Sequence, residues 1–284
     1  MKKDYQPPRT RLQLLREVVR TRWQLLLGCS ALTLLFALPM ATAGFVTEYS
    51  KALTLRQLLQ EGSADALELC IHCFGWNFVS LLMNCLWGAV AAIALSGTGR
   101  IMQLLAWRTG VIFRQDFALG VKENYKYFLV GVVFASVAAF AVQCNLDFVH
   151  YSGENATTLV VSTALTSLAA FLLLMVGAYT AAQSLQFSLN LNDGIKNAMI
   201  LIIACFPQSL LAAALLIAPF AAACLCGIGG RLVYLAVMGL FGFGFFMLAT
   251  LLLCSNVFDK TIYARFHPEN AGRGLAKDAP EETL

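Results

Sequence analysis

The sequence predicts an all-α, polytopic helical membrane protein with about six transmembrane helices and cytoplasmic N- and C-termini. The first observation is composition: 59% of the 284 residues are hydrophobic and 13% are charged, whereas soluble domains carry about 25% charged residues. The second is the distribution of charge, because each uncharged window of 20 residues or more can cross ~30 Å of hydrocarbon as a helix. Six such windows occur, at 23–47, 69–99, 127–146, 156–192, 197–230 and 232–258.

The third observation is the placement of Lys and Arg, which predicts the orientation. With six crossings and the N-terminus inside, the cytoplasmic segments hold 17 of the 20 basic residues, as the positive-inside rule requires. These segments are 1–22, 100–126, 193–196 and 259–284. The formal charge of +4 follows from this bias. Some of the basic residues are expected to contact anionic lipid. The expected partner is therefore the lipid bilayer, and no nucleic acid is needed to explain the charge.

Residues 1–22 are expected to form a basic amphipathic segment on the cytoplasmic side. Leu12, Leu15 and Val19 recur at helical spacing, and the arginines lie mostly elsewhere. This pattern predicts a short helix on the inner surface that runs into the first span. The alternative is a cleaved signal peptide, because the apolar stretch 25–38 precedes small residues at 41–43.

Residues 23–258 are expected to form one transmembrane domain. The predicted spans are about 23–44, 71–95, 127–146, 158–182, 197–220 and 232–255. Between the first two, Thr54 and Gln57 resemble a helix-capping pair, and the Gly62-Ser63 step resembles a helix stop, so a separate helix on the outer surface is predicted there.

The fifth window contains Pro207 and Pro219, which predict a kink. One kinked crossing over 197–230 is favoured over two tight crossings, because two would place the basic tail outside. Residues 259–284 are expected to be a cytoplasmic tail that is partly disordered.

Cysteines are the most conspicuous reactive residues of the chain. Cys70 and Cys73 have CxxC spacing around His72, and Cys224 and Cys226 also lie near the predicted outer face. A structural zinc site needs four converging ligands, so a packing function is favoured, with disulfides as the alternative. The sequence has no GxSxG, HExxH or Walker A motif, and we expect neither enzymatic activity nor a cofactor or metal.

Ion-coupled transport normally uses a carboxylate inside the membrane, and the six windows contain none. Only a boundary residue such as Asp116, Asp147 or Asp193 would supply one, by entering a cavity. The amides within the windows are expected to form hydrogen bonds between helices.

The charged segment between the second and third spans has its own helical pattern. Phe113, Phe117, Val121 and Tyr125 recur every four residues, with the charged residues off this stripe. We expect an amphipathic helix over about 112–126 that lies on the inner membrane surface with its aromatic stripe toward lipid. Two interpretations stay open: a connector between spans, or a docking helix for a cytosolic partner.

This segment contains Asp116-Phe117 followed by Lys122-Glu123-Asn124-Tyr125-Lys126. That pattern resembles the signature region of the YesL-like family of bacterial integral membrane proteins of unknown function. Further similarity lies in Lys196-Asn197-Ala198 with Pro207, in Val257-Phe258-Asp259-Lys260 with Ile262, and in Leu38-Pro39 with Thr42 and Gly44. The family usually has a much shorter connection between the positions of Gly44 and Asp116.

The resemblance implies a protein of the bacterial cytoplasmic (inner) membrane. Because genes of the family often lie beside those of carbohydrate ABC importers, it also implies an accessory or assembly function in carbohydrate uptake, with importer components as partners. The alternative is a small-solute permease, or an ABC-type transmembrane component that couples through the 112–126 helix. The candidate partner- or membrane-docking residues are Asp116, Phe117, Val121, Lys122, Asn124, Tyr125 and Lys126.

Overall fold

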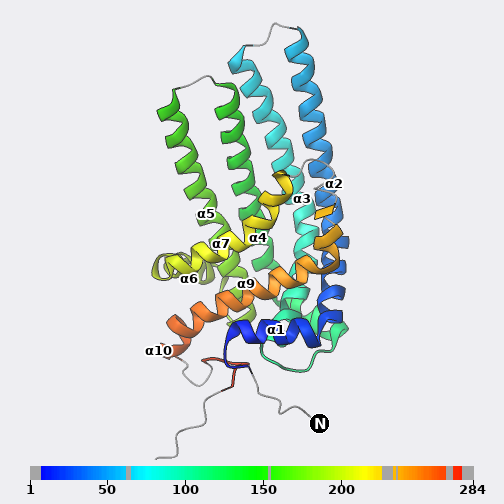
Figure 1. Ribbon diagram of the computed structural model, residues 1–284, viewed down its shortest axis with the longest axis vertical. Coiled ribbons are helices and arrows are strands. Elements are labelled where there is room, and N and C mark those ends of the chain that lie inside the picture. Colours follow the sequence, from blue (N-terminus) through cyan, green and yellow to red (C-terminus); the bar gives the residue numbers. More distant parts are fainter. Residues whose placement is uncertain are drawn as a thin grey trace, which may run out of the picture.

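Four long antiparallel helices form the body of the protein in the computed structural model (Figure 1). They are α2 (Trp23–Glu61), α3 (Ala66–Ala106), α4 (Phe113–Tyr151) and α5 (Ala156–Gln186), and each packs on the next in chain order. The structure describes residues 8–61, 65–152, 155–225, 233–234, 236–266 and 271–276, and no strand occurs among them. The all-α fold class is therefore confirmed.

Shorter helices cover the lower half of this body in Figure 1. They are α1 (Arg11–Thr21), α6 (Leu191–Ala204), α7 (Phe206–Leu225), η1 (Met238–Gly242), α9 (Phe243–Phe258), η2 (Asp259–Tyr263) and α10 (Ala264–Phe266). We call this end, with α1, the α3–α4 connection and α10, the basic end. The sequence predicts that it is cytoplasmic.

Five helical stretches are long and apolar enough to cross a membrane: α2 to α5 and residues 238–266. A sixth crossing is possible through α6 and α7, which form one apolar pair bent by 106°. Pro207 lies in the first turn of α7, where a missing backbone N–H disturbs no helical bond. The bend is thus a break between two helices. Residues 226–232 lie outside the described part of the chain, so residues 197–230 could form either one crossing or two.

Helix α2 does not end where the sequence predicted. It continues through Pro39 to Glu61 as a single helix of 39 residues, about 58 Å at 1.5 Å per residue. The expected separate helix on the outer surface is therefore wrong for residues 50–61, which extend α2 instead. The predicted stop at Gly62-Ser63 lies outside the described residues, and Asp65 begins α3 by accepting a hydrogen bond from the Glu68 N–H.

The segment 112–126 also differs from its prediction, because it is the first part of α4 rather than a separate helix on the membrane surface. Glycines explain the difference. A Cβ atom at Gly97 of α3 would lie 2.4 Å from the Phe117 ring, and one at Gly120 would lie 2.9 Å from the Ser96 carbonyl oxygen. The two helices thus approach closely, and Phe117 and Tyr125 of the aromatic stripe contact α3.

The N-terminal segment forms the predicted amphipathic helix, but with a different buried face. Thr10 and Gln13 form a capping box at the start of α1. Leu14 and Val18 are buried, whereas the predicted stripe residues Leu12 and Val19 are exposed. The exposed face is free to contact lipid because the buried one packs on α9.

The beginning of the C-terminal tail is held in place at the basic end. The helix continues past residue 258 to Phe266, so the predicted boundary of the tail at 259 is too early. The Arg11 guanidinium lies 2.6 Å from the Asp259 carboxylate and also donates to the Arg273 carbonyl. Residues 271–276 are thereby tied to α1, while 277–284 lie outside the described part.

The glycine-rich stretch that spans η1 and the start of α9 acts in helix packing. A Cβ at Gly239 would lie 2.2 Å from the Leu34 side chain, and one at Gly244 would lie 2.6 Å from the Leu26 carbonyl oxygen. The Gly244 N–H donates to the Ser30 hydroxyl at 2.8 Å. Small residues that let backbones approach closely are typical of helix interfaces in membranes.

The α3–α4 contact is expected to be sensitive to added volume at Gly120. Gly120→Val should lower the free energy of unfolding by about 1–3 kcal/mol, because the new side chain meets backbone atoms that cannot move aside easily. Gly75→Val is the matched control, since a Cβ there meets nothing within 4 Å. Thermal unfolding of both variants in detergent checks this, and equal midpoints would contradict the close approach.

Candidate functional site

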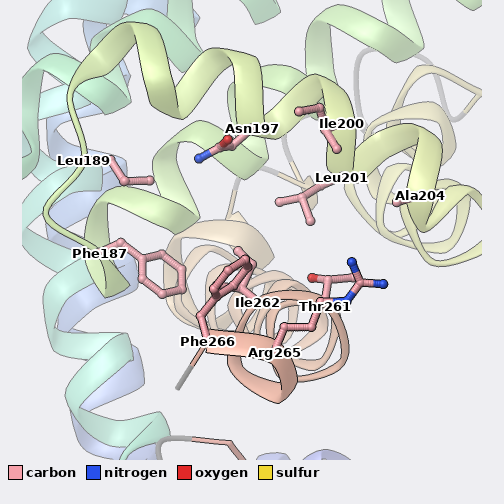
Figure 2. Close-up of a pocket in the computed structure, with 10 residues that line it drawn as sticks. All are labelled: Phe187, Leu189, Asn197, Ile200, Leu201, Ala204, Thr261, Ile262, Arg265 and Phe266. Atoms are coloured by element: carbon pink, nitrogen blue, oxygen red, sulfur yellow. The ribbon is translucent and has the colours of Figure 1, made fainter. Parts of the chain in front are cut away.

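An apolar groove opens at the basic end between α6 and the C-terminal helical turns (Figure 2). Its volume is about 560 Å³. One wall is α6, which contributes Ile200, Leu201 and Ala204, and the other is η2 with α10, which contributes Ile262 and Phe266. Apolar side chains therefore form most of both walls.

The connection from α5 to α6 closes one end of the groove. The chain turns extended at Phe187 after α5 and enters α6 after Asn190, and Phe187 and Leu189 both line the groove. The Tyr127 hydroxyl of α4 donates to the Leu189 carbonyl. The connection is thus fixed to the long-helix body.

Aromatic packing and hydrogen bonds support the groove from behind. The Phe187 ring centroid lies 5.7 Å from that of Phe258 and 5.2 Å from that of Tyr263. The Gln186 amide donates to the Ser255 hydroxyl at 2.8 Å and accepts from the Tyr263 hydroxyl at 3.4 Å. Since Tyr263 and Phe258 are buried, these contacts fix η2 relative to α5.

Three polar side chains line the groove: Asn197, Thr261 and Arg265. The Thr261 hydroxyl donates to the Val257 carbonyl of its own helix at 2.8 Å, so its donor is already used. Arg265 is exposed at one edge, and no carboxylate is among the lining residues. The groove thus combines an apolar surface with one positive charge.

The predicted docking residues divide between the protein interior and its surface. Asn124 is buried, Phe117 packs on Gly97, and Val121 is half-buried. The Tyr125 hydroxyl donates to the Ala89 carbonyl of α3 at 3.2 Å. Asp116 accepts a hydrogen bond from the Ile112 N–H at 2.6 Å and so caps α4.

Lys122 and Lys126 are the predicted docking residues that are exposed. They share the outward face of α4 with Leu119, which is also exposed and which the sequence analysis did not select. Leu119, Lys122 and Lys126 are three and four residues apart, a spacing that places them on one helix face. The same spacing can be read in the sequence, but the aromatic stripe is the more conspicuous pattern in this segment, so Leu119 was not selected. We call these three residues the outward stripe.

A buried polar cluster joins three long helices at the opposite end of the body. The Lys51 ammonium group of α2 donates to the Asp147 carboxylate of α4 at 2.6 Å and to the Asn77 amide oxygen of α3 at 3.0 Å. The Asn77 amide also donates to Asp147 at 2.6 Å. The side chains of Lys51 and Asp147 are only 11% and 18% exposed. The sequence placed both residues in outer loops, so this cluster was missed.

The cysteines near this cluster are free thiols in the structure. Cys70 and Cys73 do not form a disulfide, and the Asn77 amide donates to the Cys144 sulfur at 3.5 Å. Within the described residues, no group of three or more His, Cys, Asp and Glu side chains converges as a metal site would require. The structure does not describe Cys226 or the Cys224 side chain, so the alternative of a disulfide between those two stays open.

Removing Asp147 should destabilise the protein, because Lys51 and Asn77 would lose a buried acceptor. We expect Asp147→Ala to lower the free energy of unfolding by about 1–3 kcal/mol. The double variant Lys51→Met/Asp147→Leu should lose less, because apolar replacement of both partners removes the unpaired charge. Denaturant titration of the three proteins in one detergent gives the comparison, and a single variant as stable as the wild type would refute a stabilising cluster.

Comparisons with known proteins found no matching family model, no matching curated protein and no matching solved structure. The similarity to the YesL-like family therefore stays a prediction from short motifs. What the structure adds is that two of those motifs, at 196–198 and 257–262, meet at the groove through Asn197 and Ile262.

Proposed function

We propose that this chain is a non-catalytic accessory protein of the bacterial cytoplasmic membrane that binds a component of a carbohydrate ABC importer. The contact would be made by the outward stripe together with the adjoining end of the α3–α4 hairpin. The apolar helical bundle supports the membrane assignment. The link to carbohydrate uptake rests on the resemblance described above.

The continuity of α4 is the observation that carries this proposal. Its uncharged part begins at Tyr127, so the 14 residues from Phe113 to Lys126 precede it within one helix. At 1.5 Å per residue they extend about 20 Å from the apolar window. A helix that stands away from the membrane in this way presents its side chains to the cytosol, where a partner can reach them.

Charge indicates what kind of partner surface would fit. The two acidic residues of the segment are engaged within the fold, since Glu123 lies 3.3 Å from Arg100 and Asp116 caps α4. The basic residues Arg114, Lys122 and Lys126 are exposed. An acidic partner surface complements this face, and charge complementarity of that kind mainly accelerates association and excludes wrong partners.

Apolar residues within the outward stripe and beside it complete the proposed contact surface. Ile112 is 62% exposed, and Phe113 and Leu119 are exposed as well. Interfaces between proteins combine an apolar centre with a polar rim. The end of the α3–α4 hairpin offers both, and the proposed partner surface is therefore acidic with an apolar patch.

A permease is the second candidate, and buried acceptors favour it. Within the described part, Gln103 Oε1, Gln183 Oε1 and Thr180 Oγ1 are buried without a hydrogen-bond partner. Such groups line solute paths or hold ordered water. Uptake of labelled sugars by the chain alone in liposomes, lost in Gln183→Leu, would support transport and argue against a purely accessory function.

Partner binding should depend on the outward stripe and not on Phe117, which packs against α3. Lys122→Glu/Lys126→Glu should abolish most co-purification of importer components in mild detergent, with an unchanged unfolding midpoint, because both side chains are exposed. Arg22→Glu is the matched control, since Arg22 is an exposed base at the basic end outside the hairpin.

Phe117→Asp separates folding from docking in the same assay. It should lower the unfolding midpoint, because a charge would be placed against Gly97 in the α3–α4 contact. If the Lys122→Glu/Lys126→Glu variant co-purifies with the same importer components as the wild type, the proposed contact is refuted.

A further inference from the structure

We propose that the groove between α6 and α10 binds an anionic phospholipid, with an acyl chain along its apolar walls and the lipid phosphate at Arg265. This site is separate from the outward stripe, so the inference does not depend on the proposed partner.

The composition of the groove fits one lipid molecule. Ile200, Leu201, Ala204 and Ile262 give both walls an apolar surface in a groove of about 560 Å³. Ile200 and Phe266 are 62% and 73% exposed, so the groove is open to its surroundings. An acyl chain fits such a surface because its methylene groups can make van der Waals contacts along both walls.

The position of the groove matches the membrane boundary by two independent signals. The fifth uncharged window begins at Asn197, and the sixth ends at Phe258. Both windows therefore end at the groove, although they belong to different spans. Residues 200–204 lie on the apolar side of this boundary, while Lys260 and Arg265 lie on the charged side. A phospholipid has the same division between acyl chain and headgroup.

Charge complementarity specifies the headgroup as anionic. Arg265 is the charged residue that lines the groove, and exposed Lys196 and Lys260 belong to the helices on either side. Of the nearby carboxylates, Asp259 is engaged by Arg11 and by the Gly272 N–H, and Asp193 lies one turn before Asn197 without lining the groove. Basic pockets between transmembrane helices on the cytoplasmic side are known sites for anionic lipid headgroups.

The test compares lipid binding to the full chain in detergent by native mass spectrometry. The probes are dioleoyl phosphatidylglycerol, dioleoyl phosphatidylcholine and soluble glycerol phosphate. We expect the wild type to prefer phosphatidylglycerol, and Arg265→Gln to lower its affinity about fivefold, since a basic residue near a membrane surface contributes about 1 kcal/mol. Affinity for phosphatidylcholine should change little, because that headgroup has no net charge.

Two further variants make the result specific to the groove. Arg114→Gln is the control, because Arg114 is exposed but does not line the groove, and it should keep the wild-type preference. Ala204→Trp fills the groove from an exposed position and should reduce binding of both lipids.

Each opposite outcome overturns the proposal in a distinct way. Equal losses of phosphatidylglycerol affinity in Arg265→Gln and Arg114→Gln would show nonspecific electrostatic attraction of the lipid. Unchanged lipid binding in Ala204→Trp would show that lipid does not occupy the groove, which would then fit a partner helix instead. Competition by glycerol phosphate as strong as by phosphatidylglycerol would show a simple phosphate site.

Discussion

The close approach of α3 and α4 is the contact on which the arrangement of the basic end depends. Gly97 and Gly120 have no side chains, so the Phe117 ring and the backbone at Ser96 occupy the space between the helices. Alignment with α3 holds the charged segment 113–126 in line with the rest of α4. Phe117 and Tyr125 of the aromatic stripe contact α3, and Lys122 and Lys126 lie on the outward face.

The sequence predicted the long apolar helices correctly, because the ability to cross a membrane depends mainly on the length of an uncharged run, which is a local property. It could not decide the environment of the 112–126 helix, because an aromatic stripe is equally suited to lipid and to another helix. The deciding residues, Gly97 and Gly120, are 23 positions apart in the sequence. That these two glycines allow a close approach is seen only when the two helices are packed together. The groove is also formed by segments that are distant in sequence, so no local sequence pattern could predict it.

Charged residues end an uncharged window, but they do not end a helix. Lys51 was assigned to a segment outside the first span for this reason, yet α2 continues for ten residues beyond it. The charge is tolerated because Asp147 and Asn77 satisfy it. In this cluster, one residue from each of three helices joins the helices together. Counting charges along the sequence does not show which of these residues pair. The same argument explains why the helix over 238–266 runs past Asp259, which Arg11 neutralises.

Pairing of acidic residues turns the charge bias of the basic end into a positive surface. Glu17 contacts Arg108, Glu123 contacts Arg100, and Asp259 contacts Arg11. Asp116 is bound by a backbone N–H. Because each of these acids already has a partner within the chain, they do not balance the exposed bases of the α4 hairpin and of α10. The positive charge that orients a membrane protein during insertion is thereby also available for the two proposed contacts, with a partner at the outward stripe and with lipid at Arg265.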